Sequence, residues 1–237
     1  VNSAKDDAAG LAIGQNMTSQ IRGLNMAVRN LNDGINMMQT AEGAMVEQSN
    51  MLQRMRELAV QSMNGTYSSV QRGYLDLEFQ QLNSQINDIS TDTTWNDQVL
   101  LNDSVGTFIF QAGQASGQTI SIVIGDMGNG STGLAISGES IDTYANSSSA
   151  LTAITSALET INQQRATIGA GINRMEYAVD NLTNISSNAT QSRSTIMDTD
   201  YATATTALAK TQIIQQAATA MLAQANQQSQ SVLQLLK

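Results

Sequence analysis

The chain has 237 residues, a net charge of −9 and only 4% aromatic residues, and it contains no Cys, His or Pro. These absences exclude disulfide frameworks, zinc sites built from Cys and His, and catalysis by cysteine nucleophiles or histidine triads. The Lys and Arg residues are scattered singly and no apolar run reaches about 18 residues, so the sequence predicts neither a nucleic-acid surface nor a membrane span.

The first predicted element is a long helix over residues 3–63. Apolar residues recur along it at steps of three, four or seven, the heptad pattern of a coiled coil. The stripe consists of Met17, Ile21, Leu24, Val28, Leu31, Ile35, Met38, Met45, Leu52 and Met55. Ser3 with Asp6 predicts a capping box at the start, and Asn64-Gly65 predicts a left-handed stop. Interior glycines each cost about 1 kcal/mol relative to Ala, so we expect partner helices to pack closely against this one.

A second, shorter helix is predicted over residues 69–90. Ser68 with Gln71 predicts its capping box. Its apolar stripe has the same spacing and consists of Leu75, Phe79, Leu82, Ile86 and Ile89. Both helices therefore present an apolar face to a common core.

Residues 91–147 change from helical periodicity to alternation. The alternating apolar residues are Phe108 and Phe110, followed by Ile120, Ile122 and Ile124. Because residues 113–118 supply turn material between them, this region predicts a β-hairpin. Leu134-Ala-Ile136 predicts a further short strand, and the glycine-rich residues 125–130 lack G-x-G-x-x-G spacing and are predicted to be a loop.

A third helix is predicted over residues 148–197, with Ser147–Ser149 as its cap. Its stripe consists of Leu151, Ile154, Leu158, Ile161, Ile168, Ile172, Met175, Val179 and Leu182. Arg165 occupies one position of this stripe. It is either a buried pairing residue that sets the register of the helices or a side chain that extends to the surface, and the sequence leaves both open.

A break and a new cap at Asp198-Thr199-Asp200 precede the final predicted helix. Its stripe consists of Ile214, Met221, Ala225, Val232 and Leu235, and this helix is rich in Ala and Gln. Such a helix suits packing against another helix. The first helix begins at residue 1 without spare length, so we expect the partner to lie upstream of Val1.

The predicted fold is mainly α: an elongated rod of long antiparallel helices in a coiled-coil-like bundle, with a small β-hairpin insertion. Residues 1–198 are expected to form the rod domain and residues 199–237 a separate helical segment. The aspartates at positions 6, 7, 198 and 200 lack the spacing of a calcium loop and are expected to cap helices. The sequence predicts no catalytic, cofactor or metal site, and rods of this kind commonly serve assembly.

Several stretches resemble bacterial flagellins. The strongest are VNSAKDDAAGLAI at residues 1–13, LQRMRELAVQS at residues 52–62 and IIQQAATAMLAQANQQSQSVLQLL at residues 213–236. The likeness continues through residues 161–182 and through DTDYA at residues 198–202. The resemblance implies a structural subunit that self-assembles into the flagellar filament for swimming motility. It also implies that residues 199–237 form the C-terminal half of the core-lining helical domain.

The flagellin resemblance further implies partners and a location. The partners are other flagellin subunits, an export chaperone, and the hook-associated and cap proteins. Export uses a type III channel without a cleaved signal, so the protein is extracellular in the filament; the first residues indeed lack the layout of a secretory signal. The central segment is short, which implies that the large variable outer domains of many flagellins are missing.

The resemblance also assigns a candidate surface on the first helix. Arg54, Leu58 and Gln61 lie at steps of four and three, which predicts one helical face. In some flagellins the matching positions are sensed by a Toll-like receptor. Lateral packing between neighbouring subunits is the competing interpretation, and the same residues can serve both.

Two other function classes compete with a filament subunit. A cell-surface adhesin or polysaccharide-binding protein can be built on the same rod, although a net charge of −9 disfavours anionic glycans. An enzyme in the central segment is disfavoured because that segment is short and holds no His, Cys or clustered carboxylates.

Overall fold

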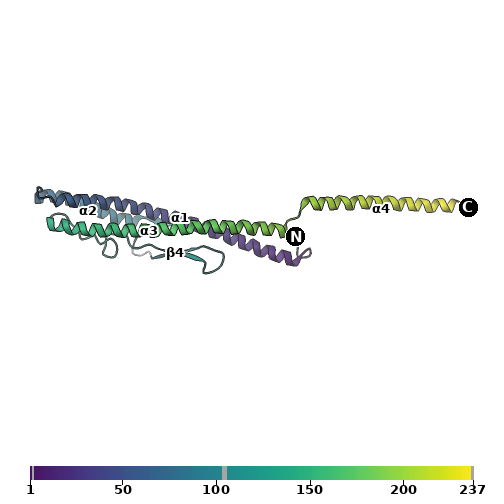
Figure 1. The fold of residues 1–237 in the computed structure, drawn as a ribbon, viewed down its shortest axis with the longest axis horizontal. Helices are drawn as coiled ribbons and strands as arrows, with labels where there is room; N and C mark the ends of the chain where they lie inside the picture. The colour runs from purple at the N-terminus through teal and green to yellow at the C-terminus, as the bar shows by residue number, and fades with distance from the viewer. Residues whose placement is uncertain (2, 103–105, 236–237) are drawn as a thin grey trace. The chain divides into compact units, whose positions relative to one another are not determined.

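The computed structural model describes residue 1, residues 3–102 and residues 106–235, the last ten of them as backbone only. The helices are α1 (Ala8–Ser62), α2 (Ser69–Asp92), α3 (Tyr144–Met197) and α4 (Tyr201–Leu235), and the strands are β1 (Thr94–Trp95), β2 (Gln98–Val99), β3 (Thr107–Gln111) and β4 (Thr119–Val123) (Figure 1). The chain divides into two units, one of residues 19–188 and one of residues 1–18 with 189–237.

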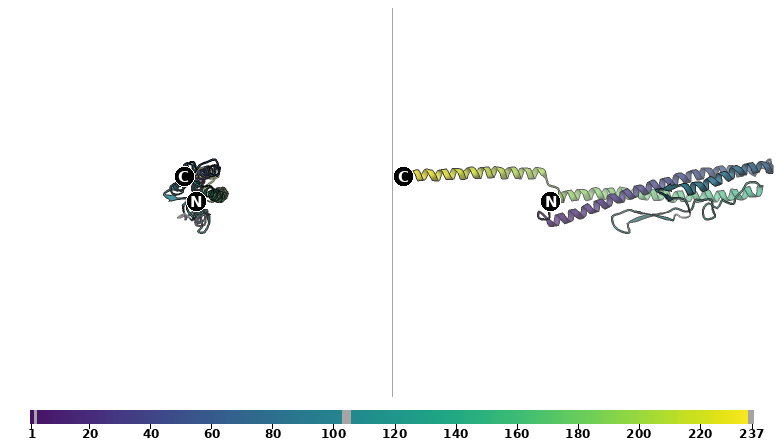
Figure 2. Two further views of the ribbon diagram at one scale, coloured as in Figure 1. Left: turned by 90° about the vertical axis from the view of Figure 1, so that its left-hand side faces the viewer. Right: turned by 180° about the vertical axis from the view of Figure 1, so that it is seen from behind.

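The unit of residues 19–188 is a bundle in which α1 and α3 run antiparallel. Ser186 Oγ donates to Asn25 Oδ1 at 2.9 Å, and Arg165 pairs with Glu42 further along. From the first contact to the second, the residue number increases on α1 and decreases on α3, as in an antiparallel pair. Figure 2 shows the two helices side by side. The predicted mainly α fold of long antiparallel helices with a small hairpin is confirmed.

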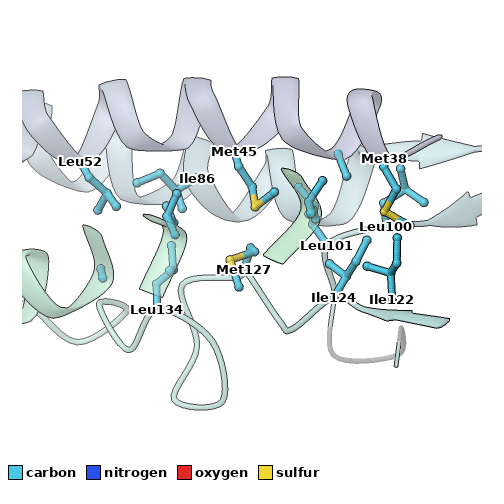
Figure 3. Close-up of a cluster of buried hydrophobic side chains, with 14 of the residues drawn as sticks. Met38, Met45, Leu52, Ile86, Leu100, Leu101, Ile122, Ile124, Met127 and Leu134 are labelled. Atoms are coloured by element: carbon cyan, nitrogen blue, oxygen red, sulfur yellow. The ribbon is translucent and has the colours of Figure 1, made fainter. Parts of the chain in front are cut away.

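The core of this unit combines most of the predicted apolar stripes with apolar residues of the central region such as Leu100 and Met127. From α1, Ile21, Leu24, Leu31, Ile35, Met38, Met45, Leu52 and Met55 are all buried. Figure 3 shows Met45 and Leu52 of α1 near Ile86 of α2, with Met127 and Leu134 of the following loop across from them. Burial of each large apolar side chain stabilises the fold by roughly 1.5–3 kcal/mol. Burial of the stripes is therefore the main source of stability that holds the helices together.

The hairpin β3–β4 is antiparallel, with Thr107 opposite Val123 and Gln111 opposite Thr119. The hairpin packs against α1 and α3 at glycines of these helices. A Cβ added to Gly34 of α1 would lie 2.8 Å from the ring of Phe110, and one added to Gly171 of α3 would lie 2.5 Å from Ile122 Cδ1. These helical glycines therefore admit the hairpin side chains close to the helix axes.

The predicted capping box of α2 is confirmed: Ser68 Oγ accepts from the Gln71 amide and the Gln71 side chain accepts from the Ser68 amide. The start predicted for α1 is wrong. Ser3 and Asp6 close a turn, and α1 begins at Ala8 because Asp7 Oδ1 accepts from the amides of Ala9 and Gly10.

The helix α1 ends at Ser62, close to the predicted position, but the predicted left-handed residue at Asn64-Gly65 is not found. Asn64 and Gly65 are both described, and neither is among the described residues with positive φ. Instead Asn64 Oδ1 accepts from the Thr66 amide at 3.2 Å, which turns the chain.

The cap predicted at residues 147–149 for α3 is also wrong. Thr143 caps the helix, because its hydroxyl accepts from the Asn146 amide at 3.2 Å. Ser147 is instead buried inside the helix and donates to the Thr143 carbonyl. A run of serines thus marks the first turn of α3 rather than its boundary.

Two features of the central region differ from the prediction. Residues 134–136 form a loop rather than a strand, with Ala135 at φ 54°. A small hairpin, β1–β2, was not predicted, and its turn places Asn96 and Asp97 at φ 48° and 62°. Two consecutive positive φ angles define the tight turn that suits a two-residue hairpin connection. The loop predicted at residues 125–130 is confirmed.

The other unit combines the ends of α1 and α3 with α4. The Val1 amine donates to the Met197 carbonyl at 2.8 Å, and Arg193 Nη1 lies 3.4 Å from Thr18 Oγ1. As predicted, residues 198–200 break the chain between α3 and α4. Asp200 caps α4, since its carboxylate accepts from the amides of Ala202 and Thr203.

Candidate subunit-packing surfaces

An exposed ionic cluster joins α1 to α2. Arg54 Nη1 lies 3.0 Å from Glu57 Oε2, and Arg54 Nη2 lies 2.9 Å from Glu78 Oε1. The Glu78 carboxylate, and after it Glu57, raises the pKa of Arg54 above its ordinary value. Exposed ion pairs contribute little to folding. Their main effect here is to fix the position of a guanidinium group at the surface.

Leu58 does not share the exposed face of Arg54 and Gln61. Its side chain is only 1% exposed, in the packed face that also includes Met55 and Ala59. Gln61 is exposed, and its Nε2 donates to Tyr67 Oη at 2.9 Å. Of the three residues predicted to share a helical face, Leu58 is therefore buried, because steps of four and three also follow the apolar stripe of a helix.

The described part of the apolar stripe of α4, up to residue 225, is exposed in the single chain. Ile214 is 56% exposed and Met221 is 70% exposed, and every residue from Tyr201 to Ala225 is exposed. The side chains of Val232 and Leu235, which the sequence assigns to the same stripe, lie outside the described part of the chain. Exposed apolar side chains along one helix are typical of a surface that packs against another protein.

A groove with a volume of about 820 Å³ lies between α1 and α3 in the unit of residues 19–188. Arg165 is one of its lining residues. Its Nη2 lies 3.6 Å from Glu42 Oε1, while its side chain remains 34% exposed. Both interpretations of Arg165 hold in part, because its Nε is buried while its charged end pairs with Glu42 and lines the groove.

Sequence reasoning missed the groove and the role of Glu78. Both depend on residues brought together from different helices, so no spacing along one helix could indicate them. The partner of Arg54 could have been inferred only from the register of α1 against α2.

The described residues hold no group of three or more Asp or Glu side chains arranged to bind a metal ion. Asp7 and Asp200 cap helices, as expected of them. None of the described helices combines the length and the apolar character needed to cross a bilayer. What the geometry offers is helical surface for contact with other proteins.

Comparison with known proteins identifies the family. Residues 1–105 match the bacterial flagellin N-terminal helical region, and residues 151–236 match the bacterial flagellin C-terminal helical region. A flagellin of Halalkalibacterium halodurans is 45% identical over 237 residues, spanning all of this chain and 87% of that protein. Flagellin B of Vibrio cholerae is 34% identical, spanning all of this chain and 90% of that protein.

The structure agrees with these matches. The crystal structure of Bacillus cereus flagellin superposes with a TM-score of 0.57 at 28% identity, covering 65% of this chain and 88% of that one. The helices α1 and α2 lie within the first matched region, and most of α3 and all of α4 lie within the second. The chain therefore belongs to the bacterial flagellin family and is a structural subunit of the flagellar filament.

Proposed function

We propose that the stripe of Ile214, Met221 and Ala225 on α4 packs against end helices of neighbouring subunits in the filament core. The supporting observation is the exposure of the described side chains of α4, residues 201–225, whereas most of the apolar stripe of α1 is buried. Long helices in water depend on packing of their apolar face for most of their stability. Residues 199–237 are then the C-terminal half of a core-lining domain, with Val232 and Leu235 continuing the stripe.

The surface around Arg54 and Gln61 is proposed to pack laterally against adjacent subunits. Arg54 is held between two carboxylates, and Gln61 is exposed about two turns further along α1. Leu58 supports this surface from within the core. A flagellin-sensing Toll-like receptor is the second proposed partner, because a fixed guanidinium group suits recognition by a carboxylate of another protein.

Export and assembly partners follow from the same exposed stripe. Subunits that polymerise outside the cell must be kept apart inside it. An export chaperone is proposed to cover α4 before secretion, since uncovered apolar surface favours association. Hook-associated and cap proteins are proposed to contact the subunits at the filament ends, and export is proposed to proceed through a type III channel without a cleaved signal.

Seeded polymerisation of the full-length protein tests the role of α4. Replacement of Ile214 with Asn or of Met221 with Gln should abolish filament growth, measured by light scattering and electron microscopy. The change removes apolar area worth roughly 25 cal/mol per Å² on burial. Gln216→Asn is the matched control, because position 216 lies about 200° around the helix from position 214.

Normal growth by Ile214→Asn and Met221→Gln would reject the proposed core packing. The thermal unfolding of the bundle should be the same in all variants, since residues 201–225 are exposed in the single chain. A fall in bundle stability would instead show that α4 contributes to folding of the subunit.

A further inference from the structure

The groove between α1 and α3 carries more positive than negative charge. Arg56 and Arg165 line it, with Glu57 as the acidic lining residue. Glu57 is already paired with Arg54 at 3.0 Å. Two guanidinium groups therefore line a hollow in a chain whose net charge is −9.

Neither guanidinium group is fully paired within the chain. Among the described residues, Arg56 forms no hydrogen bond or ion pair, and it is exposed. Arg165 reaches Glu42 at 3.6 Å, a long ion pair, and its buried Nε has no acceptor in the described part of the chain. The exposed guanidinium group of Arg56 and the partly exposed end of Arg165 are therefore available to an acceptor supplied by another molecule.

A carboxylate fits this requirement best. Guanidinium groups bind carboxylates through two parallel hydrogen bonds, which are stronger than neutral ones. Apolar lining from Val60 and Leu158 can cover the aliphatic stem of an acidic side chain. The volume of about 820 Å³ is large enough for such a side chain together with part of the helix that bears it.

We propose that this groove binds an acidic side chain of a second copy of the chain during filament growth. The proposal rests on the filament function and adds a specific contact to it. Charge complementarity favours a second copy: the chain has 20 acidic and 11 basic residues, and Glu159, Glu176 and Asp180 are exposed on α3.

The first experiment compares filament elongation by the full-length protein with that of Arg56→Gln and Arg165→Met at low and high salt. Elongation should slow about tenfold in each variant at low salt, the factor expected for loss of one charge-assisted hydrogen bond. The difference should shrink at high salt, because ions screen the attraction. Arg174→Gln is the control, since it removes the same charge from an exposed position on α3 outside the groove.

The outcomes distinguish failure of the groove proposal from failure of the filament function. If the parent protein elongates and Arg56→Gln elongates equally well with the same salt dependence, the groove does not bind a subunit. If the parent protein itself fails to elongate, the filament assignment fails and the groove proposal fails with it. Arg56 is exposed, so its variant should fold normally; circular dichroism of the monomer checks this.

The second experiment identifies the occupant. The chain contains no Cys, so Asn162→Cys places a unique thiol in the groove for a photoactivatable maleimide. Filaments grown from a mixture of ¹⁵N-labelled and unlabelled subunits should yield cross-linked peptides of mixed isotope content that contain Asp or Glu. Cross-links confined to one isotope, or to peptides without acidic residues, would overturn the proposal.

Discussion

At the scale of single residues, two glycines of α1 have different surroundings: Gly34 is closely packed, whereas Gly43 is not. A Cβ at Gly34 would meet the Phe110 ring at 2.8 Å and Met175 Sδ at 3.2 Å. A Cβ at Gly43 would meet nothing within 4 Å. Gly34 is required for close packing of the hairpin, whereas the packing of the single subunit does not require Gly43.

We therefore expect opposite effects of alanine at these positions. Gly43→Ala should raise the free energy of unfolding by about 1 kcal/mol through helix propensity. Gly34→Ala should lower it by about 1 kcal/mol, because overpacking costs about 1–3 kcal/mol and the helix gain offsets only part of this. Urea unfolding of the two variants measures the difference. Equal stabilisation by both would show that the hairpin moves away without cost.

At the scale of elements, the first turn of α4 depends on one carboxylate. The hydroxyl and amide of Thr203, with the amide of Ala202, hold the pKa of Asp200 below its ordinary value. A depressed folded pKa means that the cap stabilises the helix above the unfolded pKa, about 3.9, and is lost as pH falls through the folded value.

This predicts a loss of order at the start of α4 in acid. The amides of Ala202 and Thr203 should lose protection against exchange, relative to unstructured amides at the same pH, once the pH falls below the depressed folded pKa of Asp200. NMR measures this loss, which occurs because the cap carboxyl is then protonated. Asp200→Asn keeps a cap oxygen without a titrating group, so the protection of these amides should not change over the same range. A titration of Asp200 at or above the ordinary carboxyl pKa would contradict the prediction.

The helices could be predicted from the sequence because burial repeats with the period of the helix. The stripe from Ile21 to Met55 is buried at the expected positions, and α2 begins at the predicted capping box. Boundaries were less predictable, since several polar residues compete for each cap. Asp7 outcompetes Ser3 at α1, and Thr143 outcompetes the serine run at α3.

The candidate surfaces were predicted less well than the helices. Leu58 satisfies both the spacing of an exposed face and that of the buried stripe, and only packing of α1 in the bundle decides between them. The hairpin β1–β2 has strands of two residues, too short for a pattern of alternation to appear. The groove at Arg165 depends on the register of α1 against α3, which no single helix encodes.

At the scale of the whole molecule, the chain combines a region with its own core and a region without one. In the unit of residues 19–188, apolar stripes from three helices are buried against one another. In α4, the described side chains are all exposed. A filament subunit needs both properties, because it must fold before assembly and yet retain surface that only a neighbour can cover.

Hydrogen exchange should report this division directly. In the monomer, amides of α4 should exchange much faster than those around Met45 and Ile161, because helices without packed faces open readily. In filaments, the α4 amides should become protected while the bundle changes little. Since residues 201–225 are exposed in the single chain, protection of this part of α4 measures contacts between subunits. Equal protection of α4 and the bundle in a proven monomer would mean that the stripe is covered within the subunit.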